Sequence, residues 1–166
     1  MTTIPLDDRA LHKVRRFNRI LAWLPRFRIR NRFTPMLVQA LLRASQLGAD
    51  GRMRRRGIRL AQQVAEADGL RVPVRVLRPP GAVRGVVLDS HGGGWVIGNP
   101  CVDDAQNAAL VEACGVAVVS VDYRLVPRVP LQDAMDDCLA AARWLLAGGV
   151  PDLHGLPTFI VGESAG

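Results

Sequence analysis

The sequence predicts an α/β protein, because short apolar runs alternate with longer segments of helical character. The apolar runs at residues 83–88, 116–121 and 159–161 have the length and composition of buried strands. Two segments between them, residues 104–114 and 131–146, are long enough to form helices. Because buried strands joined through helices form parallel ladders, we expect a mostly parallel sheet with helices on its faces.

The segment before the first of these runs contains two further candidate elements. Residues 58–65 fit a strand and a helix equally well. Asp68-Gly69 is a turn signal, and residues 72–77 alternate in the manner of a strand. A Pro-Pro-Gly sequence at residues 79–81 breaks that strand. We therefore expect the sheet domain to occupy residues 57–166.

Residues 1–56 form a separate basic segment of helical character. Apolar side chains recur every three or four positions in residues 7–24, which predicts one amphipathic helix. Its apolar stripe consists of Leu11, Val14, Phe17, Leu21 and Leu24. Thr34-Pro35 supplies a capping residue and a first-turn proline for a second helix, which Gly48 ends. We expect such helices to cover part of a larger core.

The positive charge of the chain is concentrated at its N-terminal end. The net charge is +7, yet residues 1–60 hold 15 Lys/Arg against 3 Asp/Glu, and residues 61–166 are acidic overall. A basic segment can bind nucleic acid or an anionic membrane surface, or it can be a solvated helix face. No nucleic-acid-binding motif accompanies the charge, so we expect no nucleic-acid partner and favour the solvated face. Peripheral contact with an anionic membrane is the alternative.

The cysteine pattern and the N-terminus bear on the cellular compartment. The chain contains three widely spaced cysteines, Cys101, Cys114 and Cys138. Their number and spacing fit neither a disulfide framework nor a zinc site, so we expect reduced thiols, no metal and a cytoplasmic protein. Asp7, Asp8 and the short apolar stretch at residues 20–24 do not fit a secretory signal. No apolar run approaches the ~18 residues of a membrane span.

A candidate nucleophile elbow follows the last predicted strand. The sequence there is Gly162-Glu163-Ser164-Ala165-Gly166, which matches Gly-x-Ser-x-Gly. After a strand, this pattern is typical of a tight strand-to-helix turn that forces the serine into a strained backbone conformation. The flanking glycines are needed because a side chain at either position would crowd the turn. Glycine-rich loops also match the pattern by chance, so a second signal is required.

The second signal is a glycine-rich stretch after the predicted strand at residues 83–88. It reads His91-Gly92-Gly93-Gly94-Trp95. Acyl transfer places negative charge on a carbonyl oxygen, and backbone N–H groups aimed at that point stabilise it. Glycines let the backbone approach closely and turn its amides inward. In such sites the amide of the residue after the nucleophile, here Ala165, completes the oxyanion hole. The alternative, a flexible linker, seldom lies between a buried strand and a tryptophan.

A third motif, Val-Asp-Tyr-Arg-Leu-Val-Pro at residues 121–127, ends the strand predicted at residues 116–121. Asp122 and Arg124 are its charged members. We expect them to hold neighbouring loops by charge-assisted hydrogen bonds, and we assign neither to catalysis.

Together, these three segments in this order resemble the hormone-sensitive-lipase-like family of α/β-hydrolases. Its bacterial members are carboxylesterases, lipases and acetylhydrolases. The resemblance covers about residues 55–166, and its most specific feature is the pairing of the two glycine motifs, with 73 positions from His91 to Ser164. It implies an α/β-hydrolase fold, truncated here after the nucleophile elbow, with the N-terminal helices in the place of cap helices. It also implies a small-molecule ester substrate and no metal or organic cofactor.

The resemblance assigns roles to individual residues. Ser164 would be the nucleophile, the amides of Gly93, Gly94 and Ala165 would form the oxyanion hole, and His91 with Gly92 would support the loop. The sequence departs from the family pattern at two places. Glu163 stands where the family usually has Asp, and Arg128 ends a stretch that commonly reads Leu-Ala-Pro-Glu. These departures affect the expected substrate preference and loop packing.

No activating partner follows Ser164. In α/β-hydrolases the triad acid and the base histidine come after the serine along the chain, and here only Ala165 and Gly166 follow it. We expect His12 and His154 to be structural or exposed. The sequence therefore predicts an ester hydrolase by family whose 166-residue chain is itself inactive. The alternative is a non-catalytic small-molecule-binding protein on the same fold.

Overall fold

The computed structural model describes residues 8–23 and 33–166, which fall into two compact units. The N-terminal unit, residues 1–30, contains the helix α1 (Asp8–Trp23), which confirms the first predicted helix. Val14 and Phe17 of the predicted apolar stripe are exposed on α1, and Leu24 lies outside the described residues. The second unit, residues 31–166, contains every other element.

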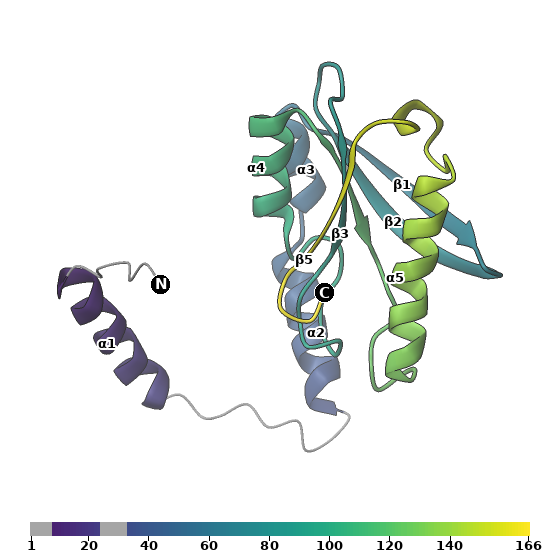
Figure 1. Ribbon diagram of the computed structural model, residues 1–166. Helices are drawn as coiled ribbons and strands as arrows, with labels where there is room; N and C mark the ends of the chain where they lie inside the picture. Colours follow the sequence, from purple (N-terminus) through teal and green to yellow (C-terminus); the bar gives the residue numbers. More distant parts are fainter. Residues whose placement is uncertain (1–7, 24–32) are drawn as a thin grey trace, which may run out of the picture. The chain divides into compact units, whose positions relative to one another are not determined.

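A five-stranded sheet forms the centre of the second unit (Figure 1). Its order is β1-β2-β4-β3-β5. The strands are β1 (Arg59–Ala67), β2 (Leu70–Arg78), β3 (Val86–Ser90), β4 (Ala117–Val121) and β5 (Thr158–Gly162). β3 is parallel to both β4 and β5, whereas β2 is antiparallel to both β1 and β4. The expectation of a mostly parallel sheet was therefore wrong: the sheet is mixed, and its parallel part consists of β4, β3 and β5.

The antiparallel half of the sheet follows from the turn at Asp68-Gly69. Both residues have positive φ, 53° and 76°, which is the backbone geometry of a two-residue hairpin turn. The turn pairs Ala67 with Leu70 and sets the register of β1 against β2 over nine residue pairs. The ambiguous segment at residues 58–65 is therefore mainly strand. Its sequence could not decide this, because the pairing partner lies on the far side of the turn.

Helices cover both faces of the sheet (Figure 1). α4 (Asp104–Cys114) and α5 (Leu131–Leu146) have the predicted bounds. α5 packs on one face through Ala140, Ala141 and Leu145. The other face is covered by α4 and by α3 (Ala49–Arg55), a short helix that the sequence did not predict. Only Ala49 and Met53 of α3 are buried, which is too weak a pattern to detect.

The second predicted helix is present as α2 (Phe33–Ser45), and Gly48 separates it from α3 with a φ of 76°.

A buried ion pair connects α3 and α4 to the sheet. Arg75 of β2 is 1% exposed and contacts Asp104 of α4 and Asp50 of α3. Because a buried guanidinium without partners would be costly, this pairing fixes α3 and α4 on one sheet face. No helix among the described residues is both long and apolar enough to cross a bilayer.

The edge strand β5 presents two large apolar side chains to solvent. β5 pairs only with β3, and Phe159 and Ile160 are 58% and 67% exposed. On α5, Met135 and Leu139 are also exposed. An apolar strand with one open edge is a template for association between chains.

We predict that Ile160→Lys raises the highest protein concentration at which the 166-residue chain remains monomeric, because a charge at the open edge opposes strand addition. The free energy of unfolding should change by no more than about 0.5 kcal/mol, because the site is exposed. Light scattering and urea titration measure the two effects. Val87→Lys, at a buried position on β3, is the matched control and should unfold the chain. Unchanged association in Ile160→Lys would contradict the prediction.

Candidate active site

The parallel pairing of β3 and β5 brings the two glycine motifs together. Ser90, the last residue of β3, lies opposite Gly162, the last residue of β5. The segments that follow therefore leave the sheet side by side at the same edge. Gly92 marks how close they come: a Cβ there would lie 3.0 Å from the carbonyl oxygen of Glu163 and 3.7 Å from Cβ of Ser164.

The backbone at Ser164 has the strained geometry expected of an elbow. Its φ is 57°, in the left-handed region that residues other than glycine rarely adopt. The side chain is exposed. A Cβ on Gly162 would collide with the backbone of Gly166, and a Cβ on Gly166 would collide with the carbonyl oxygen of Ser90. Both glycines are thus required by close backbone approach.

The glycine-rich loop turns its amides away from internal acceptors. Gly93 and Gly94 have φ values of 124° and 61°, and a Cβ on Gly93 would collide with the carbonyl oxygen of Ile97. Within the part of the chain that the structure describes, the amides of Gly93, Gly94 and Ala165 donate to no protein acceptor. The three amides without an internal acceptor are therefore available to donate to a ligand.

His91 is a buried support of this loop. The ring is 1% exposed and stacks on Tyr123, with 4.2 Å between ring centroids. Its Nδ1 lies 2.8 Å from the carbonyl oxygen of Gly92, so Nδ1 carries the proton, and Tyr123 donates its hydroxyl to the carbonyl oxygen of His91 at 2.5 Å. Burial lowers the pKa of His91, which keeps the ring neutral. Gly98, with a φ of 131°, packs directly against the ring.

Two further contacts hold the loop, and the sequence predicted neither of them. Gln39 of α2 is buried; it donates to the carbonyl oxygen of Gly98 at 2.7 Å and accepts from the Gly98 amide at 2.9 Å. On the other side, the amide of Val126 donates to the carbonyl oxygen of Trp95 at 2.8 Å. A polar residue among the inward positions of α2 was the only signal that could have identified Gln39.

Of the two charged residues in the motif at residues 121–127, only Arg124 holds a neighbouring element through hydrogen bonds. Arg124 binds Asp137 of α5 with two guanidinium contacts of 2.8 Å, and its amide donates to the same carboxylate at 2.9 Å. The expectation of charge-assisted hydrogen bonds is therefore confirmed for Arg124. It was wrong for Asp122: among the described residues its carboxylate accepts no hydrogen bond. Desolvation by the surrounding protein raises the pKa of Asp122, and the positive charge of Arg43 opposes that rise.

The remaining histidines are His154 and His12. His154 follows the short helix at residues 151–153 and precedes β5, at the opposite end of that strand from the elbow. Asp152 beside it forms an ion pair with Arg78, the last residue of β2. His12 is in α1, in the separate N-terminal unit. The structure thus brings Ser164 together with the glycine motifs but places neither His91 nor His154 as its base.

A buried polar network lies under the elbow. Asp89 of β3 accepts from Asn107 of α4 at 2.7 Å and from Ser120 of β4 at 2.8 Å. Asp103, at the start of α4, is buried nearby. Burial, followed by the charges of Asp89 and Glu163, raises its pKa to about 6. Folding therefore favours the protonated form of Asp103.

The sheet order, the strained serine and the free amides define the class: this is an α/β-hydrolase fold. A family model described as alpha/beta hydrolase fold matches residues 87–166. The carboxylesterase NlhH of Mycobacterium tuberculosis is 40% identical over 115 residues, which cover 66% of this chain and 35% of NlhH. The ethyl acetate hydrolase of Pseudomonas putida is 42% identical over 83 residues, or 48% of this chain and 26% of that protein.

The crystal structure of the esterase LipW from Mycobacterium marinum superposes with a TM-score of 0.73 at 27% identity, over 82% of this chain and 44% of LipW. These matches agree with the resemblance to the hormone-sensitive-lipase-like family of α/β-hydrolases. It spans well under two thirds of the length of each of these relatives.

We predict that Gln39→Ala destabilises the second unit by about 1–3 kcal/mol, because the buried amide and carbonyl of Gly98 lose their partner. Urea unfolding followed by tryptophan fluorescence measures the loss. Gln62→Ala, on an exposed position of β1, is the matched control and should change stability by less than about 0.5 kcal/mol. Equal effects of the two substitutions would show that Gln39 does not brace the loop.

We predict that Asp103→Asn stabilises the chain at pH 8 by about 1–3 kcal/mol. Because the folded pKa is raised to about 6, ionising Asp103 costs stability as pH rises from about 4 to 6, and the full cost is present above pH 6. The difference between variant and parent should therefore shrink towards zero near pH 4. Urea titrations from pH 4 to 8 measure it, with Asp136→Asn as a control on α5. A difference that is independent of pH would contradict the assignment.

Proposed function

We propose that this chain carries the nucleophile and the oxyanion hole of a carboxylic ester hydrolase. Ser164 is the nucleophile, and the amides of Gly93, Gly94 and Ala165 bind the oxyanion. The observation that carries this proposal is the presence of three amides without internal acceptors beside a strained, exposed serine. The names of the relatives, a carboxylesterase and an ethyl acetate hydrolase, favour esters as the substrate class.

The proposed reaction forms and breaks one bond to the acyl carbon in each half. Oγ of Ser164 attacks the ester carbonyl, its proton passes to a base, and the carbonyl oxygen becomes an oxyanion held by the three amides. Collapse expels the alcohol, which takes the proton, and leaves an acyl-serine. Water then attacks the acyl-serine, gives up a proton through the base, and releases the carboxylic acid and free Ser164. His91 and Gly92 support the loop and take no proton in either half.

The proposal needs a base that neither His91 nor His154 supplies. His91 is buried and stacked on Tyr123, and burial lowers its pKa, which weakens it as a base. His154 precedes β5, at the opposite end of that strand from the elbow. The 166-residue chain by itself should therefore show no serine-dependent turnover, although its nucleophile and donors are in place.

We predict that a chimera, in which Gly166 continues into the part of NlhH beyond the matched segment, hydrolyses 4-nitrophenyl butyrate. The added part would supply the acid and the base, which follow the serine in this fold, while the nucleophile comes from this chain. Ser164→Ala in the chimera should lower kcat by at least roughly a thousandfold. Release of 4-nitrophenolate is the measurement.

The unextended chain and its Ser164→Ala variant are the controls and should be equally inactive. Serine-dependent turnover by the unextended chain would contradict the requirement for an external base. A folded chimera without turnover would contradict the ester hydrolase proposal and favour a non-catalytic binding protein on the same fold.

A further inference from the structure

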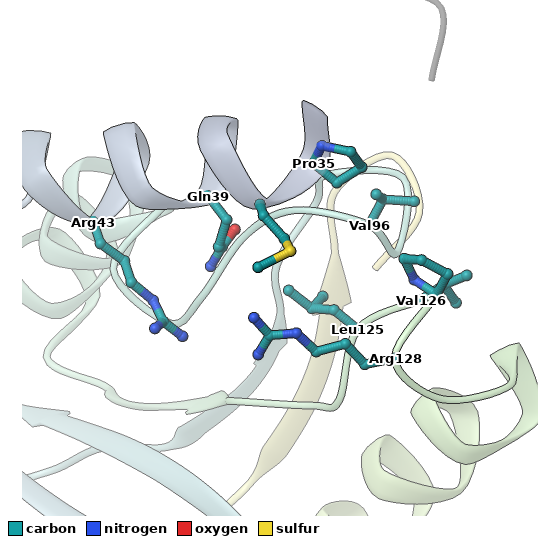
Figure 2. A pocket seen from close by; sticks show the side chains of 9 residues that line it. Pro35, Gln39, Arg43, Val96, Leu125, Val126 and Arg128 are labelled. Atoms are coloured by element: carbon teal, nitrogen blue, oxygen red, sulfur yellow. The ribbon is translucent and has the colours of Figure 1, made fainter. Parts of the chain in front are cut away.

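A cavity of about 360 Å³ lies between α2 and the segment at residues 125–128 (Figure 2). Its volume falls within the range of small-molecule sites. Most of its lining is apolar, with three polar side chains among nine. The lining residues are Pro35, Met36, Gln39, Arg43, Val96, Leu125, Val126, Pro127 and Arg128.

The cavity borders the loop that carries the proposed oxyanion donors. Val96 of its wall follows Gly94 by two positions. Both walls of the cavity form hydrogen bonds with the loop. On one wall, the Gln39 side chain bonds the amide and the carbonyl of Gly98; on the other, the amide of Val126 donates to the carbonyl oxygen of Trp95. A ligand in this cavity would therefore lie against the loop on which Gly93 and Gly94 sit.

Two arginines from different elements enter the cavity. Figure 2 shows the guanidinium groups of Arg43, from α2, and Arg128, from the opposite wall, extending into the same space. Among the described residues, neither guanidinium forms a hydrogen bond or an ion pair. Arg75, Arg78 and Arg124 of the same unit all have carboxylate partners. Arg43 influences the pKa of Asp122 through its charge, but no ion pair joins them.

Both arginine residues are exposed to solvent and line the same cavity without a carboxylate partner, so both guanidinium groups are available to bind an anion. The planar fork of arginine matches a carboxylate in particular. The apolar lining of Met36, Val96 and Leu125 suits a hydrocarbon body attached to that anion. The combination selects a ligand with a short apolar chain that ends in a carboxylate.

We propose that this cavity is a subsite for a free carboxylate on the ester substrate, so that the preferred substrates are half-esters of short dicarboxylic acids. Arg43 and Arg128 bind the carboxylate, and the apolar wall contacts the connecting chain. This inference rests on the proposed ester hydrolase function, whose substrate class it specifies.

Binding to the 166-residue chain tests the subsite without any turnover. Monoethyl succinate and diethyl succinate are matched in their ester group and differ in charge. We expect the anionic monoester to bind at least roughly tenfold more tightly at low salt, and the preference to weaken as salt rises. Titration calorimetry or NMR chemical shifts measure both affinities. Equal affinity for the two compounds would overturn the proposal.

Variants identify the residues responsible. Arg128→Glu, which restores the acidic residue common in the family, should abolish the preference for the monoester. Arg43→Gln should reduce it by roughly three- to tenfold. Arg54→Gln, on an exposed position of α3 outside the cavity, is the matched control and should leave the preference unchanged. A loss of the preference in Arg54→Gln as large as in Arg128→Glu would assign it to overall charge and overturn the subsite.

The NlhH chimera provides a second measurement, which also covers variants that fail to stay folded alone. The ratio of kcat/KM for 4-nitrophenyl hydrogen succinate to that for 4-nitrophenyl butyrate should fall at least roughly tenfold in Arg128→Glu. Hydrolysis of the neutral ester should persist. If hydrolysis persists and the ratio does not change, the subsite is wrong and the proposed function stands. If hydrolysis is absent, the proposed function fails on its own measurement.

Discussion

The site depends on the parallel register of β3 and β5. With Ser90 opposite Gly162, the glycine-rich loop and the elbow leave the sheet at one level, and their backbones touch at Gly92 and Gly166. A side chain at Gly166 would collide with the carbonyl oxygen of Ser90, and a Cβ at Gly92 would lie in tight contact, 3.0 Å, with the carbonyl oxygen of Glu163. A shift of one residue would turn the side chains of β5 to opposite faces and separate Ser164 from the free amides.

The free amides need a rigid support to act as a preorganised oxyanion hole. Stacking of His91 on Tyr123 and the pair of hydrogen bonds from Gln39 fix the loop at its two ends. The amide of Val126 fixes its middle at Trp95. Preorganised donors avoid reorganisation when charge develops, so these supports contribute to the proposed chemistry without touching a substrate. The burial that keeps His91 neutral also makes it unsuitable as a base.

Local patterns in the sequence were sufficient for the elements that define the fold and the elbow. The bounds of α4 and α5, the hairpin turn at Asp68-Gly69 and the strained backbone of Ser164 all follow from signals within a few residues. The antiparallel pairing of β2 with β4 could not be predicted, because it joins segments more than 40 positions apart. The contacts of Gln39 and of Asp89 could not be predicted for the same reason, because their partners are distant in sequence. A single polar residue on an apolar face does not indicate which group it will bind.

α2 connects the two inferred properties of the site. Gln39 and Arg43 are four positions apart, so they share one face of the helix. The first holds the oxyanion loop through Gly98, and the second extends into the cavity beside that loop. A carboxylate bound by Arg43 and Arg128 would bridge the same two walls that grip the loop through Gln39 and Val126. Binding at the cavity would then reinforce the positions of the amides of Gly93 and Gly94, which links substrate charge to the stability of the oxyanion hole.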